Sequence, residues 1–266
     1  MNYKRQIFCG LAVIACLAGC SWFKRLTETC FVLTDLEGNV LQKEGNCDVQ
    51  ESPCSTFKVA LALMGFDAGV LKSKTEPQFD YDDRYPCALD IWKQPHNPKM
   101  WIENSCVWYS QKIIAALGAQ QFQRYVHNFD YGNQDISGSL PEGKGHTKPW
   151  LCSSLKISPI EHVAFLKKLL RAELPVSLAA RAQTKKILFI GDLLAGWQLY
   201  GKTGGGRCDR THRSFGWFVG WVTKGQKTLI FACLLKGDVG KSVVSGTDAK
   251  KMAIRKLLRH LSACAE

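Results

Sequence analysis

Near the end of the chain, three strand-like apolar runs follow one another with no helical pattern between them. They span residues 197–200, 216–222 and 228–232, and they are rich in the aromatic and β-branched side chains that favour strands. Lys224-Gly225-Gln226-Lys227 separates the last two runs and predicts a hairpin turn. Strands joined by tight turns pair antiparallel, whereas parallel strands need a crossover helix. The order therefore excludes a doubly wound parallel sheet.

Helical patterns occupy most of the remaining chain. A short hairpin is expected at residues 31–41, with Glu37-Gly38-Asn39 as its turn. Ser158-Pro159-Ile160-Glu161 is a capping box with Pro at the first helical position. The fold class is thus α+β: an antiparallel β-sheet flanked by helices, with a mostly helical region. Helices are expected at about residues 55–64, 103–117, 119–128, 159–169, 177–189 and 247–261, and loops at 72–98 and 137–148.

The composition is that of a globular chain. The 266 residues are 46% hydrophobic and 22% charged, which excludes wholesale disorder and allows a full core. The net charge is +12, but Lys and Arg are spread along the chain in nothing longer than pairs such as Lys167-Lys168. This distribution indicates a solvated basic surface, and no nucleic-acid partner is expected.

The N-terminus has the pattern of an export signal. Lys4 and Arg5 precede roughly a dozen apolar or small residues, which is typical of a secretory signal peptide and too short to span a membrane stably. The segment ends in Leu17-Ala18-Gly19-Cys20, which resembles a bacterial lipobox whose cysteine is lipidated; the alternative is ordinary cleavage near Ala18 or Gly19. We expect a signal peptide over residues 1–19, cleaved near 18–20, and a single domain over 20–266. The expected location is the periplasm, with a lipid anchor at Cys20 as the outer-membrane alternative.

Twelve cysteines are many for a chain of this length, and export would permit disulfides. Cys30 and Cys47 flank the expected N-terminal hairpin and form the best candidate pair. Cys106, Cys152 and Cys233 lie in apolar runs and are expected as buried thiols. The chain has no Cys-x-x-Cys and no His-x-x-x-His spacing, so no metal site is expected.

Residues 196–203 match the phosphate-binding pattern G-x-x-x-x-G-K-T. That motif needs a helix directly after the loop, with its N-terminal N–H groups facing phosphate. Here the variable positions are bulky and strand-like, and Gly204-Gly205-Gly206 follows. The segment is therefore expected to be a strand and not a nucleotide site.

Ser55-Thr56-Phe57-Lys58 carries the first chemical signal. One helical turn separates Ser55 from Lys58, which places both side chains on one face. A serine hydroxyl needs a base to become a nucleophile, and a lysine whose pKa is lowered by burial can be that base. The alternative for the motif alone is an exposed lysine after a capping serine.

Three later motifs add to the signal from Ser55 and Lys58. Ser105-Cys106-Val107 offers a second hydroxyl, Tyr131-Gly132-Asn133 is a turn, and Lys202-Thr203-Gly204 places a cation and a hydroxyl at an expected strand end, followed by Gly205. A cation, a hydroxyl and close backbone approach suit an anionic acyl substrate.

The four motifs in this order resemble those of class D β-lactamases (oxacillinases) in the serine penicillin-recognising superfamily. Further segments that resemble the family are residues 130–138, Trp150-Leu151, residues 155–158 and residues 216–221, so the resemblance spans essentially the whole mature chain. Class A enzymes carry S-D-N where this chain has Ser105-Cys106-Val107. The resemblance implies a β-lactamase and penicillin-binding transpeptidase-like fold, and hydrolysis of β-lactam antibiotics through an acyl-serine, giving antibiotic resistance.

The resemblance also implies roles for single residues. Ser55 would be the nucleophile, and Lys58 would react with CO2 to give N6-carboxylysine, a carbamate that serves as general base; no other cofactor is implied. Trp150 would donate its N–H to the carbamate, and Ser105 would pass a proton to the β-lactam nitrogen. The backbone N–H groups of Ser55 and Gly205 would form the oxyanion hole. Phe57, Val107 and Leu151 would line the lysine pocket, and the implied substrate-binding residues are Lys202, Thr203, Gly204, Gly205, Val107 and Tyr131, the last with a structural role as the alternative.

One position departs from the family pattern. Many members carry an arginine for the substrate carboxylate near the start of the last helix, where this chain has Asp248-Ala249-Lys250-Lys251. Either Lys250 substitutes for this arginine, or Lys202 and Thr203 suffice to bind the substrate carboxylate. Two other functions share these motifs: a penicillin-binding sensor that acylates without hydrolysis, and a D-alanyl-D-alanine peptidase.

Overall fold

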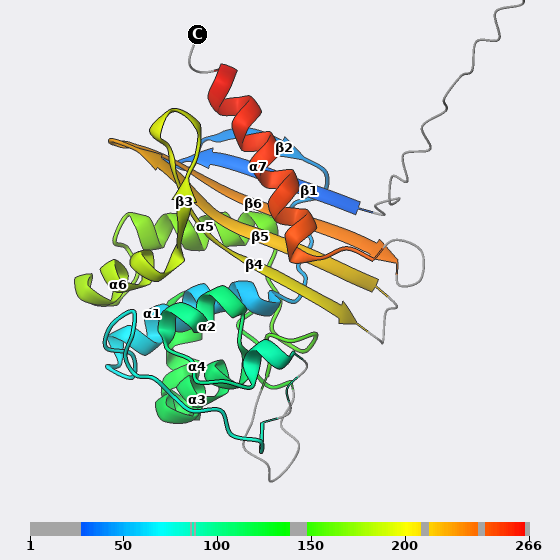
Figure 1. Ribbon diagram of the computed structural model, residues 1–266. Helices are drawn as coiled ribbons and strands as arrows, with labels where there is room; N and C mark the ends of the chain where they lie inside the picture. Colours follow the sequence, from blue (N-terminus) through cyan, green and yellow to red (C-terminus); the bar gives the residue numbers. More distant parts are fainter. Residues whose placement is uncertain are drawn as a thin grey trace, which may run out of the picture.

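The computed structural model describes residues 28–85, 87, 89–138, 148–208, 213–238 and 243–263. Within these residues six strands form one sheet in the order β2-β1-β6-β5-β4-β3, and all neighbouring strands are antiparallel (Figure 1). The predicted α+β class with an antiparallel sheet is therefore confirmed. The strands are β1 (Glu28–Asp35), β2 (Val40–Glu44), β3 (Phe189–Asp192), β4 (Gln198–Cys208), β5 (Arg213–Lys224) and β6 (Lys227–Asp238).

Helices cover both faces of the sheet. The C-terminal helix α7 lies across one face and packs on β4, β5 and β6, whereas α5 packs on the opposite face and the region of α1 to α4 extends beyond the β4 side (Figure 1). The helices are α1 (Lys58–Asp67), α2 (Pro98–Asn104), α3 (Val107–Leu117), α4 (Ala119–Asn128), α5 (Pro159–Leu170), α6 (Leu178–Leu188) and α7 (Gly246–Ala263), with 3-10 turns η1 (Cys54–Phe57), η2 (Asp90–Trp92) and η3 (Leu194–Gly196). None of the described helices is long and apolar enough to cross a membrane.

Strand periodicity produces two cores, one on each face of the sheet. In β5, Trp217, Val219 and Trp221 join the core under α5 and the helical region. The alternate residues Phe218 and Val222 join the second core, under α7. Successive strand side chains point to opposite faces, so the continuous apolar run at residues 215–222 is that of a strand buried on both sides.

The structure corrects the sequence prediction at three elements. The single helix expected at residues 103–117 is broken, because Ser105 has a left-handed backbone with φ of 55° and separates α2 from α3. Helix α2 was missed between the loop expected at 72–98 and the helix expected at 103–117, although Asn97 caps it and Pro98 occupies its first turn. Strand β3 was also missed. Residues 139–147 of the loop expected at 137–148 lie outside the described residues.

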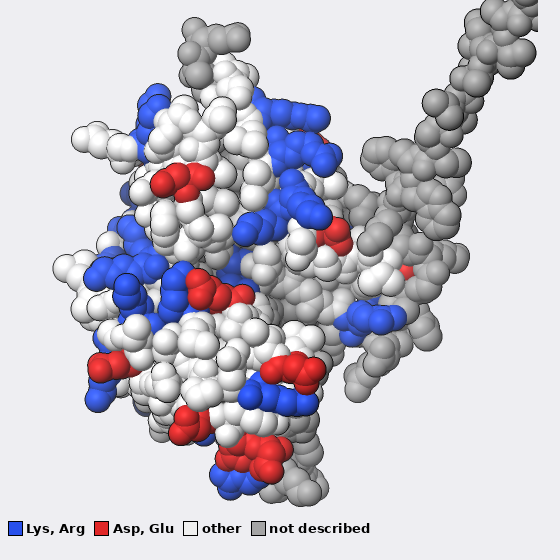
Figure 2. Space-filling view, in the orientation of Figure 1, with Lys and Arg blue, Asp and Glu red and all other residues white. Residues whose placement is uncertain are grey.

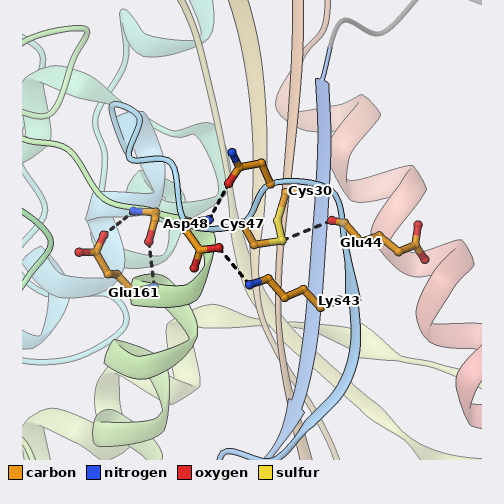
Figure 3. A network of polar contacts seen from close by, with 8 residues as sticks. Cys30, Lys43, Glu44, Cys47, Asp48 and Glu161 are labelled. Carbon is orange, nitrogen blue, oxygen red and sulfur yellow. Dashed lines mark hydrogen bonds and ion pairs between the residues drawn. A yellow bond between two sulfur atoms is a disulfide. The ribbon is translucent and has the colours of Figure 1, made fainter.

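The N-terminal hairpin carries the predicted disulfide between Cys30 and Cys47 (Figure 3). Lys43 pairs with Asp48 beside it, at 3.0 Å. The predicted capping box is confirmed: Ser158 and Glu161 exchange hydrogen bonds at the start of α5. Cys106 and Cys233 are buried thiols as predicted, whereas Cys152 lies in a turn and is only half-buried.

Charge is distributed as the sequence suggests. Figure 2 shows basic side chains spread over the visible face, with acidic side chains between them and no single basic stripe. The expected signal peptide and Cys20 lie outside the described residues.

Candidate active site

The turn that holds Ser55 leads directly into a buried helix. η1 supplies the first tight turn and α1 continues from Lys58, with every residue from Lys58 to Phe66 buried. Ser55 remains half-buried at the start of this turn. The Lys58 Nζ donates to the Ser55 Oγ at 3.1 Å, which confirms that the two side chains share one helix face.

Burial determines the chemistry of Lys58. Its side chain is fully buried, and the loss of solvation lowers its pKa from 10.5 to about 8. The amine is therefore far more often neutral near pH 7 than an exposed lysine, and a neutral amine can accept a proton or attack an electrophile.

The aromatic rings of Phe57 and Trp150 form a wall of the pocket beside Ser55 and Lys58. Phe57 stacks on Trp150, with ring centroids 5.7 Å apart, and both side chains are fully buried. The Trp150 Nε1 is buried and has no hydrogen-bond partner among the described residues. A buried unsatisfied donor is costly, so this N–H is suited to an acceptor that enters the pocket.

Lys202 and Ser105 meet across the pocket. The Lys202 Nζ donates to the Ser105 Oγ, and it also donates to the Thr203 carbonyl oxygen at 3.0 Å. Burial, followed by the positive charges of Lys58 and Lys250, lowers the pKa of Lys202 well below its ordinary value. An incoming anion would relieve this repulsion.

Lys250 lies beside Lys202. The two lysines line one cavity of about 220 Å³ together with Thr203, Phe218 and Lys99, and the Lys250 Nζ is 6.0 Å from the centre of the Phe218 ring. The start of α7 thus brings the positive charge of Lys250 close to Lys202, as is required if Lys250 replaces the arginine found in many members of the family.

Glycines let strand β4 approach the nucleophile turn. A Cβ at Gly204 would lie 2.9 Å from the Pro53 carbonyl oxygen and 3.1 Å from the Thr56 nitrogen, closer than a side chain tolerates. Gly205 pairs with Gly216 in the sheet. The motif at Lys202 lies inside β4 and not at a strand end as expected, because β4 continues through the glycines to Cys208. The same strand confirms that residues 196–203 are not a phosphate-binding loop.

The other predicted site residues differ in how deeply they are buried. Val107 and Leu151 are half-buried and pack against the core that contains Phe57. Tyr131 is fully buried and packs edge-on against Phe57 and Phe165. Its assignment as a substrate-binding residue stays a prediction; its burial among aromatic rings is consistent with the structural alternative.

Two buried polar residues were missed by the sequence analysis. The Thr56 Oγ1 is 3.2 Å from the His162 Nε2 and also donates to the Pro53 carbonyl oxygen. Burial lowers the pKa of His162 to about 3, so the ring is neutral and supports the nucleophile turn from α5. Thr56 lies inside the motif itself, but no spacing in the sequence connects it to a histidine more than a hundred residues later.

Comparison with known proteins agrees with this geometry. Residues 34–254 match the family described as penicillin binding protein transpeptidase domain. The chain is 40% identical over 232 residues to β-lactamase OXA-1 of Escherichia coli, covering 86% of this chain and 83% of that protein. It is 37% identical over 233 residues to β-lactamase OXA-9 of Klebsiella pneumoniae, covering 85% of each chain.

The fold comparison gives the same result. The crystal structure of the class D β-lactamase OXA-427 superposes with a TM-score of 0.82 at 39% identity, covering 88% of this chain and 99% of that chain. The motifs that meet in the pocket and the match over most of the chain lead to one conclusion: this protein belongs to the class D family of serine β-lactamases.

Proposed function

We propose that this protein hydrolyses the amide bond of β-lactam antibiotics through an acyl-Ser55 intermediate. The contact between the buried Lys58 amine and the Ser55 hydroxyl carries the proposal, because it places a base at the nucleophile. The Ser55 Oγ bonds to the lactam carbonyl carbon, the C–N bond breaks and the nitrogen takes a proton. Water then releases the acid and restores Ser55.

We propose that Lys58 works as N6-carboxylysine, formed with CO2. Three features fit this group: an amine whose pKa is lowered, an apolar wall formed by Phe57 and Trp150, and an indole N–H with no acceptor in the described part of the chain. When bound, the carbamate supplies a carboxylate-like base in place of the amine. Lys58 and Trp150 are the residues that would hold it.

The remaining pocket residues have roles in substrate binding and proton transfer. Lys202 and Thr203 bind the substrate carboxylate, and Lys250 adds a second positive charge on the same side of the pocket. Ser105, which accepts a hydrogen bond from Lys202, passes a proton to the leaving nitrogen. The backbone N–H groups of Ser55 and Gly205 stabilise the oxyanion, with each donor contributing roughly 3–4 kcal/mol.

The cellular role is proposed from the N-terminal pattern. Export to the periplasm would place the enzyme where β-lactams reach the cell-wall enzymes, and the result would be antibiotic resistance. Lipidation at Cys20 is tested by metabolic labelling with a fatty acid: label on the wild type and none on Cys20→Ala is expected, whereas an unlabelled wild type means ordinary signal cleavage.

Steady-state turnover of a chromogenic β-lactam, measured with added bicarbonate, tests the function. Many turnovers per molecule are expected from the wild type and none from Ser55→Ala. A single stoichiometric burst with the adduct on Ser55 would identify a penicillin sensor. Release of D-alanine from a peptide ending in D-alanyl-D-alanine, without β-lactam turnover, would identify a peptidase.

A further inference from the structure

Two thiols lie next to each other beside the nucleophile. Cys54 directly precedes Ser55 and is buried, and Cys152 lies two residues after Trp150 and is half-buried. A Cβ added at Gly206 would be 2.8 Å from the Cys54 Sγ and 3.2 Å from the Cys152 Sγ. Both sulfur atoms therefore occupy the space above the same glycine of β4.

The two segments that carry these thiols are hydrogen-bonded to each other. The Cys54 backbone N–H donates to the Trp150 carbonyl oxygen at 2.9 Å, and the Cys152 N–H donates to the Ser52 Oγ at 2.9 Å. The Ser52 hydroxyl in turn donates to the Trp150 carbonyl oxygen at 2.8 Å. These hydrogen bonds fix the two backbone segments side by side, so the closeness of the two sulfur atoms does not depend on side-chain rotamers alone.

The thiols also interact directly. A hydrogen bond with the Cys152 side chain, together with burial, raises the pKa of the Cys54 thiol well above its ordinary value. Both residues have a left-handed backbone, with φ of 48° at Cys54 and 49° at Cys152. Residues with side chains hold this conformation only where the surrounding structure enforces it.

We propose that Cys54 and Cys152 form a redox-active pair that closes to a second disulfide and covalently joins the nucleophile turn to the Trp150 loop. The described part of the chain already contains a disulfide, between Cys30 and Cys47, and disulfides persist in oxidising compartments. The oxidant is a small disulfide such as oxidised glutathione. Nothing in the catalytic proposal requires this pair.

The exchange balances in two steps. The half-buried Cys152 thiol loses its proton and its sulfur attacks one sulfur of the small disulfide, whose S–S bond breaks and releases one thiol. The Cys54 sulfur then attacks Cys152 in the mixed disulfide, loses its own proton and releases the second small thiol. The protein gives up two electrons and two protons, and the small disulfide takes them up to become two thiols.

Peptide mapping of the intact wild-type protein tests the pair. The protein is equilibrated with oxidised or reduced glutathione, alkylated, digested without reduction and analysed by mass. Oxidation is expected to remove two alkylatable thiols together and to yield a peptide pair joined through Cys54 and Cys152. A bridge between other cysteines, glutathione retained on Cys152 alone, or full alkylation of both residues would overturn the proposal.

Thermal unfolding supplies a second readout. Oxidised wild type is expected to melt several degrees above the reduced protein, and a reductant should reverse the shift. Because the Cys30–Cys47 bridge can also be reduced, the variants are compared in a background in which Cys30 and Cys47 are both replaced by Ser. In that background Cys152→Ser should lose the redox-dependent difference. The matched control Cys233→Ala, which alters a buried thiol of β6 facing the α7 core, should retain it; an unchanged difference in Cys152→Ser would refute the assignment.

Discussion

The lowered pKa of Lys58 predicts how activity depends on CO2 and pH. Only the neutral amine reacts with CO2, and with a pKa of about 8 roughly 9% of Lys58 is neutral at pH 7, against roughly 0.03% for an ordinary lysine. Burial thus raises the reactive fraction about 300-fold. Between pH 7 and pH 6 the neutral fraction falls about tenfold, and forming the anionic carbamate from the neutral amine and CO2 also releases one proton. The dissolved CO2 concentration that restores half of the activity should therefore rise about a hundredfold.

The assay is turnover of a chromogenic β-lactam in CO2-depleted buffer, titrated with bicarbonate at pH 6, 7 and 8. Each point is expressed as dissolved CO2, because the bicarbonate equilibrium itself shifts with pH. Carbon-13 NMR with labelled bicarbonate should show one carbamate signal, absent from Lys58→Ala. A half-saturating CO2 concentration that does not change with pH would refute the role of the neutral amine, and activity without any carbamate signal would refute the modification.

Three further predictions concern the same pocket and the N-terminal hairpin. Because the pKa of Lys58 is lowered from 10.5 to about 8, its charging costs about 3 kcal/mol of folding stability, a cost that is complete below pH 8 and disappears as pH rises past 10.5. Lys58→Met should therefore unfold at higher denaturant concentration than wild type at pH 7 without CO2, and a less stable variant would contradict this. Trp150→Phe keeps an aromatic ring beside Phe57 but removes the indole N–H, so the half-saturating CO2 concentration should rise about tenfold or more. The smaller ring also leaves a cavity that lowers stability, but that loss does not depend on CO2; an unchanged bicarbonate titration would mean that the indole does not hold the carbamate. Replacing both Cys30 and Cys47 by Ser opens a bridge with a sequence separation of 17, which should lower the free energy of unfolding by about 3 kcal/mol in denaturant titrations, whereas equal stability with and without reductant in the wild type would show that the bridge does not form.

Local sequence patterns were sufficient wherever neighbouring residues decide the conformation. The capping box at Ser158, the hairpin turn at Gly225 and the one-turn spacing of Ser55 and Lys58 depend on residues close in sequence, and all three appear in the structure. The resemblance placed the catalytic candidates because short motifs keep their order along the chain.

Tertiary packing decided what the patterns could not. The break at Ser105 depends on a left-handed backbone that the apolar periodicity of residues 103–117 does not reveal. The burial that lowers the pKa of Lys58, the aromatic wall that covers Tyr131 and the meeting of Lys202 with Ser105 all join segments far apart in the chain. The sequence determined which chemical groups are present and in what order; only the packed structure, by excluding water and bringing charges together, determined how reactive they are.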